Sequence, residues 1–156
     1  MCIRDSVSCD LISPQPGAMD ELRRLLPMVD YFLPSAAEAV MLSGHDDLAD
    51  AARFFIDCGA GNCIIKAGAR GAVAVLDGAV VTVPAYEIKP VDTTSCGDAF
   101  CAGFLTGLDR GLEAVDACRF ATATAALIAQ GPGTLGLLTG VQDVETAMTT
   151  LPTRAA

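Results

Sequence analysis

Two aspartates separated by small residues form the part of the sequence best suited to chemistry. Asp92 and Asp98 enclose a stretch of small residues, and small and apolar residues follow it. This pattern predicts an extended segment that turns directly into a helix, with the backbone N–H groups of Ser95, Cys96 and Gly97 at the turn. A helix N-terminus binds anions through unpaired amide donors and the helix dipole. We therefore expect an anion hole at these three residues.

Asp98 would lie in the first turn of that helix. A carboxylate there either satisfies the helix dipole or acts beside the anion as a base for an attacking hydroxyl. The residues alone leave both roles open.

The overall charge makes a local anion site necessary if the ligand is anionic. The 156 residues carry 10 Lys and Arg against 19 Asp and Glu, a net charge of −9. Such a chain repels phosphate backbones, so we expect no nucleic-acid partner. Apolar residues make up 52% of the chain, which favours one folded domain, or a piece of one, over disorder.

The cysteines predict reduced thiols in a cytoplasmic protein. Their number, seven, is odd, and no C-x-x-C pair or signal peptide accompanies them. A zinc site is disfavoured because His45 is the only histidine and the cysteine spacings are too wide for paired ligands. Cys96 is expected to be the most reactive thiol, modestly activated by the helix N-terminus.

Periodicity and turn signals place strands and helices in alternation. Strands are predicted over 7–12, 29–33 and 63–67, and a hairpin is predicted over 72–83 around Asp77-Gly78. Helices are predicted over 19–26, 35–43, 48–56, 97–108, 113–129 and 144–149. This alternation indicates an α/β class in which helices cover a sheet. The first six residues fit no element and are interpreted as a non-native scar.

The segment from Phe120 to Gln142 carries no charge and is long enough to cross a membrane. However, Gly131-Pro132-Gly133 interrupts it, and the uninterrupted helical part would rise only about 15 Å. A buried core helix is the better interpretation, so we expect no membrane partner.

Several common motifs of nucleotide-binding proteins and hydrolases are missing from the sequence. There is no G-x-x-x-x-G-K-[ST], no G-x-G-x-x-G after a strand and no G-x-S-x-G. A P-loop NTPase, a dinucleotide-binding Rossmann fold and a serine hydrolase are therefore disfavoured.

The stretch Asp92-Thr93-Thr94-Ser95-Cys96-Gly97-Asp98 resembles the second signature of ribokinase-like, or PfkB-type, carbohydrate kinases, D-T-x-G-A-G-D. Ser95 and Cys96 replace the usual glycine and alanine by other small residues. The resemblance implies a three-layer α/β/α fold and phosphoryl transfer from ATP, with Asp98 as the catalytic base.

The resemblance extends toward the N-terminus. Leu33-Pro34-Ser35-Ala36-Ala37-Glu38 is similar to the family element L-P-N-x-x-E, which implies that Glu38 organises Mg²⁺ through waters. Ser35 with Glu38 is also a capping-box spacing. The segment 65–72 resembles the turn T-L-G-x-x-G, which implies nucleotide binding by Lys66, Gly68 and Gly71.

Toward the C-terminus, the segment 120–127 resembles the helix that lines the adenine pocket, with Thr122 where asparagine is common. The following loop implies nucleotide contacts at Gly131 and Gly133. Asp92 and Thr94 would border a monovalent cation site, which implies K⁺ beside ATP and Mg²⁺.

The match covers the second half of a family chain, from about residue 9 to the C-terminus, and residues 7–156 are interpreted as that part. The first half, with most sugar contacts, is missing, so the sugar stays open and the chain alone is expected to be inactive.

The alternative is a nucleotide-binding or oligomer-forming fragment without turnover. A thiol-redox role for Cys96 is a distant third. The expected partners are a sugar and ATP, and a homodimer of the complete protein is compatible with the resemblance.

Overall fold

The computed structural model describes residues 6–12, 14–134, 136–137 and 140–154. The chain forms two compact units. The first unit comprises residues 1–66 and 73–81, and the second comprises residues 67–72 and 82–156. The proposed scar at 1–6 falls almost wholly outside the described residues.

The described strands form one sheet in the order β1-β2-β3-β4-β5. Their bounds are Ser8–Cys9, Tyr31–Phe32, Asn62–Lys66, Ala72–Leu76 and Ala79–Val83. β1, β2 and β3 are parallel, with Ser8 opposite Tyr31 and Phe32 opposite Cys63. β4 and β5 follow as a hairpin around Asp77-Gly78, as predicted, and a two-residue connection joins only antiparallel strands. The sheet is therefore mixed.

β1 and β2 are shorter than predicted because little of each segment finds a partner. The Val7 carbonyl accepts the amides of Asp30 and Tyr31, and the Cys9 carbonyl accepts that of Leu33. Beyond Cys9, the Leu11 amide donates to the side chain of Asp10 at 2.8 Å instead of to a neighbouring strand.

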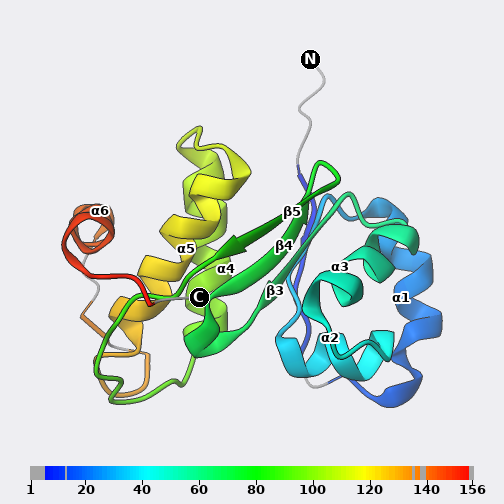
Figure 1. The fold of residues 1–156 in the computed structure, drawn as a ribbon, viewed down its shortest axis with the longest axis horizontal. Coiled ribbons are helices and arrows are strands. Elements are labelled where there is room, and N and C mark those ends of the chain that lie inside the picture. Colours follow the sequence, from blue (N-terminus) through cyan, green and yellow to red (C-terminus); the bar gives the residue numbers. More distant parts are fainter. Residues whose placement is uncertain (1–5, 13, 135, 138–139, 155–156) are drawn as a thin grey trace. The chain divides into compact units, whose positions relative to one another are not determined.

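Three helices belong to the first unit: α1 (Met19–Leu25), α2 (Ala36–Ser43) and α3 (Leu48–Asp57). They gather beside β3 (Figure 1), and α2 and α3 pack against it. Single 3₁₀ turns occur at η1 (Pro16–Ala18) and η2 (Leu26–Met28). The fully buried Phe32 and Phe55 meet edge to face in this core, with ring centroids 4.9 Å apart.

The second unit is built on a helical hairpin. α4 (Cys96–Asp109) and α5 (Ala114–Ile128) lie side by side, and α6 (Val141–Thr150) packs on α5 (Figure 1). The 3₁₀ turn η3 (Gly68–Arg70) belongs to the same unit. α5 is buried along most of its length, which confirms the predicted core helix. No helix of the described part is long and apolar enough to cross a bilayer.

The core of the second unit forms where α5 meets α6 and the connector after β5. Its buried members are Tyr86, Phe120, Ala123, Ala126, Leu127, Val144 and Ala147. The C-terminal segment closes this core by antiparallel pairing of Thr153 with Tyr86. The connector predicted over 84–91 is thus fixed at its start.

Candidate functional site

The extended segment before α4 turns directly into the helix, as predicted. Ser95 adopts a left-handed conformation, with φ 59° and ψ 9°, and the helix begins at Cys96. The Cys96 amide is engaged, since it donates to the Thr93 carbonyl at 3.2 Å. The next two amides, of Gly97 and Asp98, have no acceptor within the helix. Gly97, one of the three residues predicted to form the anion hole, is therefore a donor at the helix start, as is Asp98.

Asp98 is exposed and faces an open pocket. The pocket has a volume of about 370 Å³, within the range of small-ligand sites. It is lined by Ser95, Asp98, Ala99, Ala102, Thr124, Ile128 and Thr134, all in the second unit. Asp98 thus lines this cavity at the start of α4, an arrangement suited to a phosphate group and a reacting hydroxyl.

Asp92 ties this turn to the glycine-containing loop after α5. Its Oδ1 accepts the backbone N–H and the hydroxyl of Thr94, at 2.8 and 2.7 Å. Its Oδ2 accepts the Gly133 N–H at 2.9 Å. The hydrogen bonds from Thr94, followed by that from Gly133, hold the pKa of Asp92 below its usual range. Asp92 and Thr94, predicted as cation ligands, therefore already bond to each other.

The loop after α5 folds back tightly onto the end of that helix. A Cβ at Gly131 would lie 2.7 Å from the Gly136 Cα, so this position accepts only glycine without a shift. Gly133 has a left-handed φ of 57° and faces open space. Both predicted glycines thus shape the loop beside Thr134 of the pocket.

Thr122 is the residue of α5 that was predicted to contact adenine. Its side chain is buried, with 6% exposed, and its hydroxyl donates to the Cys118 carbonyl at 2.8 Å. Thr124, two residues further along α5, is equally buried and donates to the Phe120 carbonyl at 2.9 Å, but it lines the pocket. Sequence reasoning missed Thr124 because an alanine-rich helix does not reveal which face meets a cavity.

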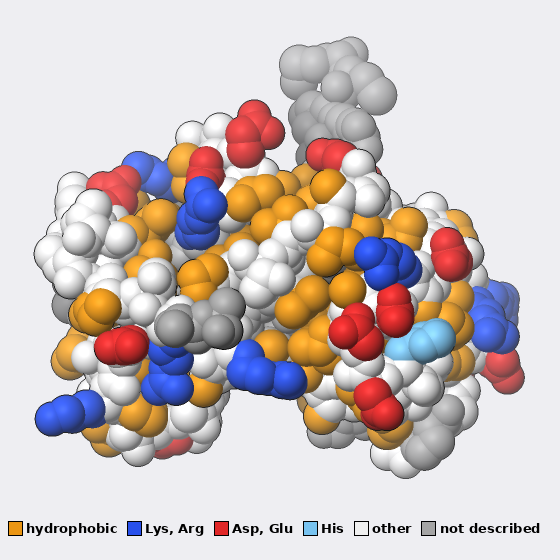
Figure 2. Space-filling view, in the orientation of Figure 1, with side chains coloured by type: hydrophobic (Ala, Val, Ile, Leu, Met, Phe, Trp, Pro, Cys, Tyr) orange, Lys and Arg blue, Asp and Glu red, His pale blue; other side chains and the backbone are white. Residues whose placement is uncertain are grey.

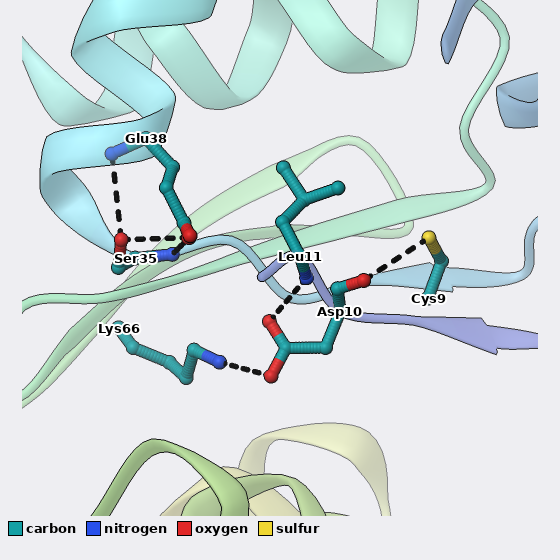
Figure 3. Close-up of polar contacts among 6 residues, drawn as sticks. All are labelled: Cys9, Asp10, Leu11, Ser35, Glu38 and Lys66. Carbon is teal, nitrogen blue, oxygen red and sulfur yellow. Dashed lines mark hydrogen bonds and ion pairs between the residues drawn. The ribbon is translucent and has the colours of Figure 1, made fainter. Parts of the chain in front are cut away.

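A second polar cluster lies in the first unit, at the carboxyl ends of three parallel strands (Figure 3). Asp10 follows β1, Glu38 follows β2, and Lys66 ends β3. The Lys66 ammonium lies 2.6 Å from the Asp10 Oδ2, and the side chain of Lys66 is 13% exposed and that of Asp10 28%. Lys66, predicted to contact a phosphate, is therefore held by Asp10, which sequence reasoning missed. The position of Asp10 directly after a strand was the available signal.

The capping box predicted at the start of α2 is confirmed. The Glu38 Oε2 accepts the backbone N–H and the hydroxyl of Ser35, both at 2.7 Å (Figure 3). The Glu38 amide in turn donates to the Ser35 hydroxyl at 3.4 Å. Within the described residues the second carboxylate oxygen of Glu38 has no hydrogen-bond partner. This fits a contact to Mg²⁺ through water, because Mg²⁺ keeps several waters and uses few carboxylates.

Direct binding of a metal ion by several protein side chains is a separate question from binding through water. Among the residues that the structure describes, no group of three or more His, Cys, Asp or Glu side chains is placed to hold a metal ion.

The predicted turn after β3 owes its shape to Gly71. Gly71 has φ 85°, and a Cβ there would lie 2.0 Å from the Val83 carbonyl oxygen. Gly68 also has a positive φ, of 57°, but meets nothing within 4 Å. Gly68, Gly71 and the pocket around Asp98 belong to the second unit, whereas Glu38 and Lys66 belong to the first.

The predicted activation of Cys96 is contradicted. Burial and the nearby Asp92 carboxylate both raise the pKa of the Cys96 thiol. The amide of Cys96 is engaged with Thr93, which removes one donor that was expected to stabilise a thiolate. Cys63 and Cys118 are buried, and burial raises their pKa values, that of Cys118 to about 12.

Comparison with known proteins identifies the family. A family model described as pfkB family carbohydrate kinase matches residues 2–139. A cytidine kinase of Thermococcus kodakarensis is 43% identical over 95 residues, which cover 59% of this chain and 34% of that protein. A deoxyribokinase of Salmonella typhi is 30% identical over 129 residues, which cover 80% of this chain and 42% of that protein.

The fold agrees with solved relatives. A putative ribokinase II from E. coli, solved in complex with ATP and Mg²⁺, has a TM-score of 0.79 and 25% identity. The match covers 92% of this chain and 48% of that one. The chain therefore belongs to the pfkB carbohydrate kinase family and has the ribokinase-like α/β fold. It spans between about a third and a half of the length of these relatives.

Proposed function

We propose that the complete protein transfers the γ-phosphoryl group of ATP to a hydroxyl of a sugar or sugar-like substrate. The observation that carries the proposal is Asp98, an exposed carboxylate at the N-terminus of α4, beside a pocket of ligand size. The family match supports it, since the similar proteins named above are kinases.

The chemistry divides between the Asp98 side chain and the helix start. The substrate hydroxyl oxygen attacks the γ-phosphorus, the bond to the ADP oxygen breaks, and the hydroxyl proton passes to Asp98. Asp98 would act mainly by its position beside the reacting hydroxyl. The amides of Gly97 and Asp98 would hold the γ-phosphoryl oxygens, where negative charge must be stabilised.

Metal ions would complete the charge balance. Bound Mg²⁺ neutralises phosphate charge in phosphoryl transfer, and Glu38 would hold its waters through the oxygen outside the capping box. Lys66 would offer its ammonium to a phosphate at the expense of its contact with Asp10. A K⁺ site at Asp92 and Thr94 has less support, since these two residues bond to each other.

The test is Asp98→Asn in the complete protein. The best acceptor is first chosen from a panel of sugars and nucleosides by ADP release. We expect kcat to fall by a factor of about 10²–10⁴, the range of general-base help, while Mg-ATP still binds. Asp116→Asn is the matched control, because Asp116 lies on α5 and forms an exposed pair with Arg119. Wild-type kcat in Asp98→Asn would overturn the proposed base.

For the 156-residue chain alone, we propose nucleotide binding without turnover. The chain spans 34% and 42% of the two curated kinases named above, so much of their length has no counterpart in it. Binding of Mg-ATP without phosphorylation of any acceptor in the panel would support this second proposal.

A further inference from the structure

A second cavity in the same unit lies beside the one that Asp98 lines. It has a volume of about 320 Å³ and is enclosed by residues of α4, α5 and the start of α6. Its lining residues are Ala102, Gly103, Thr106, Phe120, Thr124, Gly140, Val141 and Val144. Ala102 and Thr124 line both cavities, so the two adjoin along α4. The candidate site described above uses only the first of them.

Asp98 and the second cavity lie along one face of α4. Asp98, Ala102 and Thr106 follow one another at intervals of four residues, which places their side chains in one row along the helix. At a rise of 1.5 Å per residue, the row is about 12 Å long. It is therefore longer than a single sugar ring, and its far end is the second cavity.

The chemistry of phosphoryl transfer decides which reactant extends along this row. The attacking oxygen, the phosphorus and the leaving oxygen lie roughly in line. The base must reach the attacking hydroxyl, so the acceptor lies on the side of Asp98 and the nucleotide lies beyond the γ-phosphorus. A group that extends from Asp98 along α4 therefore belongs to the acceptor and not to the adenine of ATP.

The lining of the second cavity suits a ring with apolar faces and hydrogen-bond donors at its edge. Phe120 and Val144, both buried, contribute apolar surface. The two side-chain hydroxyls of the lining have already given their protons to helix carbonyls. Thr106 donates to the Ala102 carbonyl at 2.8 Å, and Thr124 donates to the Phe120 carbonyl at 2.9 Å. Such a hydroxyl can still accept a hydrogen bond but has no second proton to donate.

A bare sugar does not match this cavity. Its hydroxyl groups surround the ring, and they would lose hydration there without equivalent partners, which costs free energy. Ligand sites of this size are typically apolar with a few polar groups that fix the orientation of the ligand.

We propose that the second cavity takes the base of a nucleoside, whose ribose hydroxyl meets Asp98 at the other end of the row. A nucleobase is flat, has apolar faces and carries N–H donors at its edge, which matches an apolar cavity with two accepting hydroxyls. The inference rests on the proposed function, because it assigns the acceptor of that reaction.

Binding to the 156-residue chain tests the assignment without any turnover. With methyl-labelled protein, cytidine should shift the NMR signals of Thr106, Val141 and Val144, and ribose should bind at least about tenfold more weakly. No shift with cytidine would overturn the assignment.

Phenyl β-D-riboside tests whether the edge of the base matters. It has the same sugar and a hydrocarbon ring, so it keeps the apolar contact and loses the donors. We expect it to bind at least about threefold more weakly than cytidine, the loss of one hydrogen bond. Equal binding would overturn a site for a nucleobase.

A bulky residue at Thr106 tests the position of the base. Thr106 is partly exposed, so Thr106→Trp occupies the cavity without replacing a core residue. We expect the Kd for cytidine to rise at least about tenfold, because the ring is excluded. Unchanged affinity for cytidine would contradict the inference.

Thr146→Trp is the matched control. The Thr146 hydroxyl donates to the Gln142 carbonyl on α6 at 2.7 Å, as that of Thr106 does on α4, and Thr146 is not among the residues that line either cavity. It should leave the Kd for cytidine within about twofold. The chain has no Trp, so each variant carries a single one, whose fluorescence reports whether the variant is folded.

Nucleotide binding separates the acceptor from the phosphoryl donor. In Thr106→Trp, we expect the Kd values for Mg-ATP and Mg-ADP to stay within about twofold of the wild type. If both nucleotides weakened as strongly as cytidine, the cavity would hold adenine, and the inference would fail.

Turnover in the complete protein separates this inference from the proposed function. The value of kcat/KM for cytidine should exceed that for ribose by at least about tenfold. If cytidine bound in the cavity and no acceptor were phosphorylated, the proposed function would fail while the base site stood. If ribose were the better acceptor, the nucleoside assignment would fail while the kinase activity stood.

Discussion

Ser95 determines how the chain enters α4, because its left-handed backbone reverses the direction of the extended segment within one residue. The family signature carries glycine in this region, and glycine adopts a positive φ without steric cost. The serine keeps the turn but adds a Cβ in an unfavourable place. The local geometry is therefore stabilised by neighbours rather than by Ser95 itself.

We expect Ser95→Gly to stabilise the chain, by up to about 1 kcal/mol, because the relief of left-handed strain outweighs the greater freedom of glycine in the unfolded chain. Urea unfolding measures the free energy. Ser95→Ala is the control, since it keeps the Cβ and should bring no gain. Equal effects of the two substitutions would show that the strain is not at the Cβ.

Cys96 should be a slow nucleophile at neutral pH. Burial and Asp92 raise its pKa, so the thiol stays protonated as pH rises through the range where a free cysteine ionises. Its rate of alkylation by iodoacetamide, followed by peptide mapping, should be below that of free cysteine at pH 7 and should rise only at higher pH. If Cys96 were alkylated faster than free cysteine at pH 7, the thiol would be activated after all.

At the scale of the elements, the contact between α4 and α5 depends on glycine. A Cβ at Gly103 would lie 2.6 Å from the Thr124 Oγ1 and 2.9 Å from the Ala121 Cα. Gly107 is similarly close to Ala117. The helices therefore approach closely enough for Asp98 and Thr124 to line one pocket.

Gly103→Ala should push α4 and α5 apart and destabilise the chain by about 1–3 kcal/mol, as overpacking does. The matched control is Gly17→Ala, because Gly17 has nothing within 4 Å of its Cβ position. Thermal unfolding compares the two variants. If Gly103→Ala unfolded at the same temperature as the wild type, α4 and α5 would accommodate the added methyl group without loss of stability.

At the scale of the whole molecule, large apolar side chains are exposed. Ile12 is 95% exposed, Val91 66% and Met28 63%. Hydrophobic side chains also occupy broad areas of the face shown in Figure 2. Exposed apolar area of this kind favours association.

We expect the isolated 156-residue chain to associate at micromolar concentration and to have negligible sugar kinase activity. Sedimentation velocity measures the first property, and ADP release with the panel of acceptors measures the second. Ile12→Ser should reduce association if the exposed apolar surface drives it. A monodisperse monomer with turnover would contradict both expectations.

The sequence by itself determined the local structure and the family. The Asp77-Gly78 hairpin, the Ser35–Glu38 capping box and the helix after Ser95 all follow from interactions within a few residues, and the structure confirms them. The signature around Asp98 indicated the family because the order of its residues along the chain carries that information. The family model then confirmed it.

Only the tertiary structure decided which distant groups meet. Asp10 pairs with Lys66 across 56 residues, Asp92 reaches Gly133 across 41, and Thr124 rather than Thr122 faces the pocket. Burial and the neighbouring Asp92 carboxylate raise the pKa of the Cys96 thiol, whereas the sequence alone predicted activation by the helix start. Spacing along a chain fixes contacts over one or two turns, whereas strand order and helix packing fix the rest.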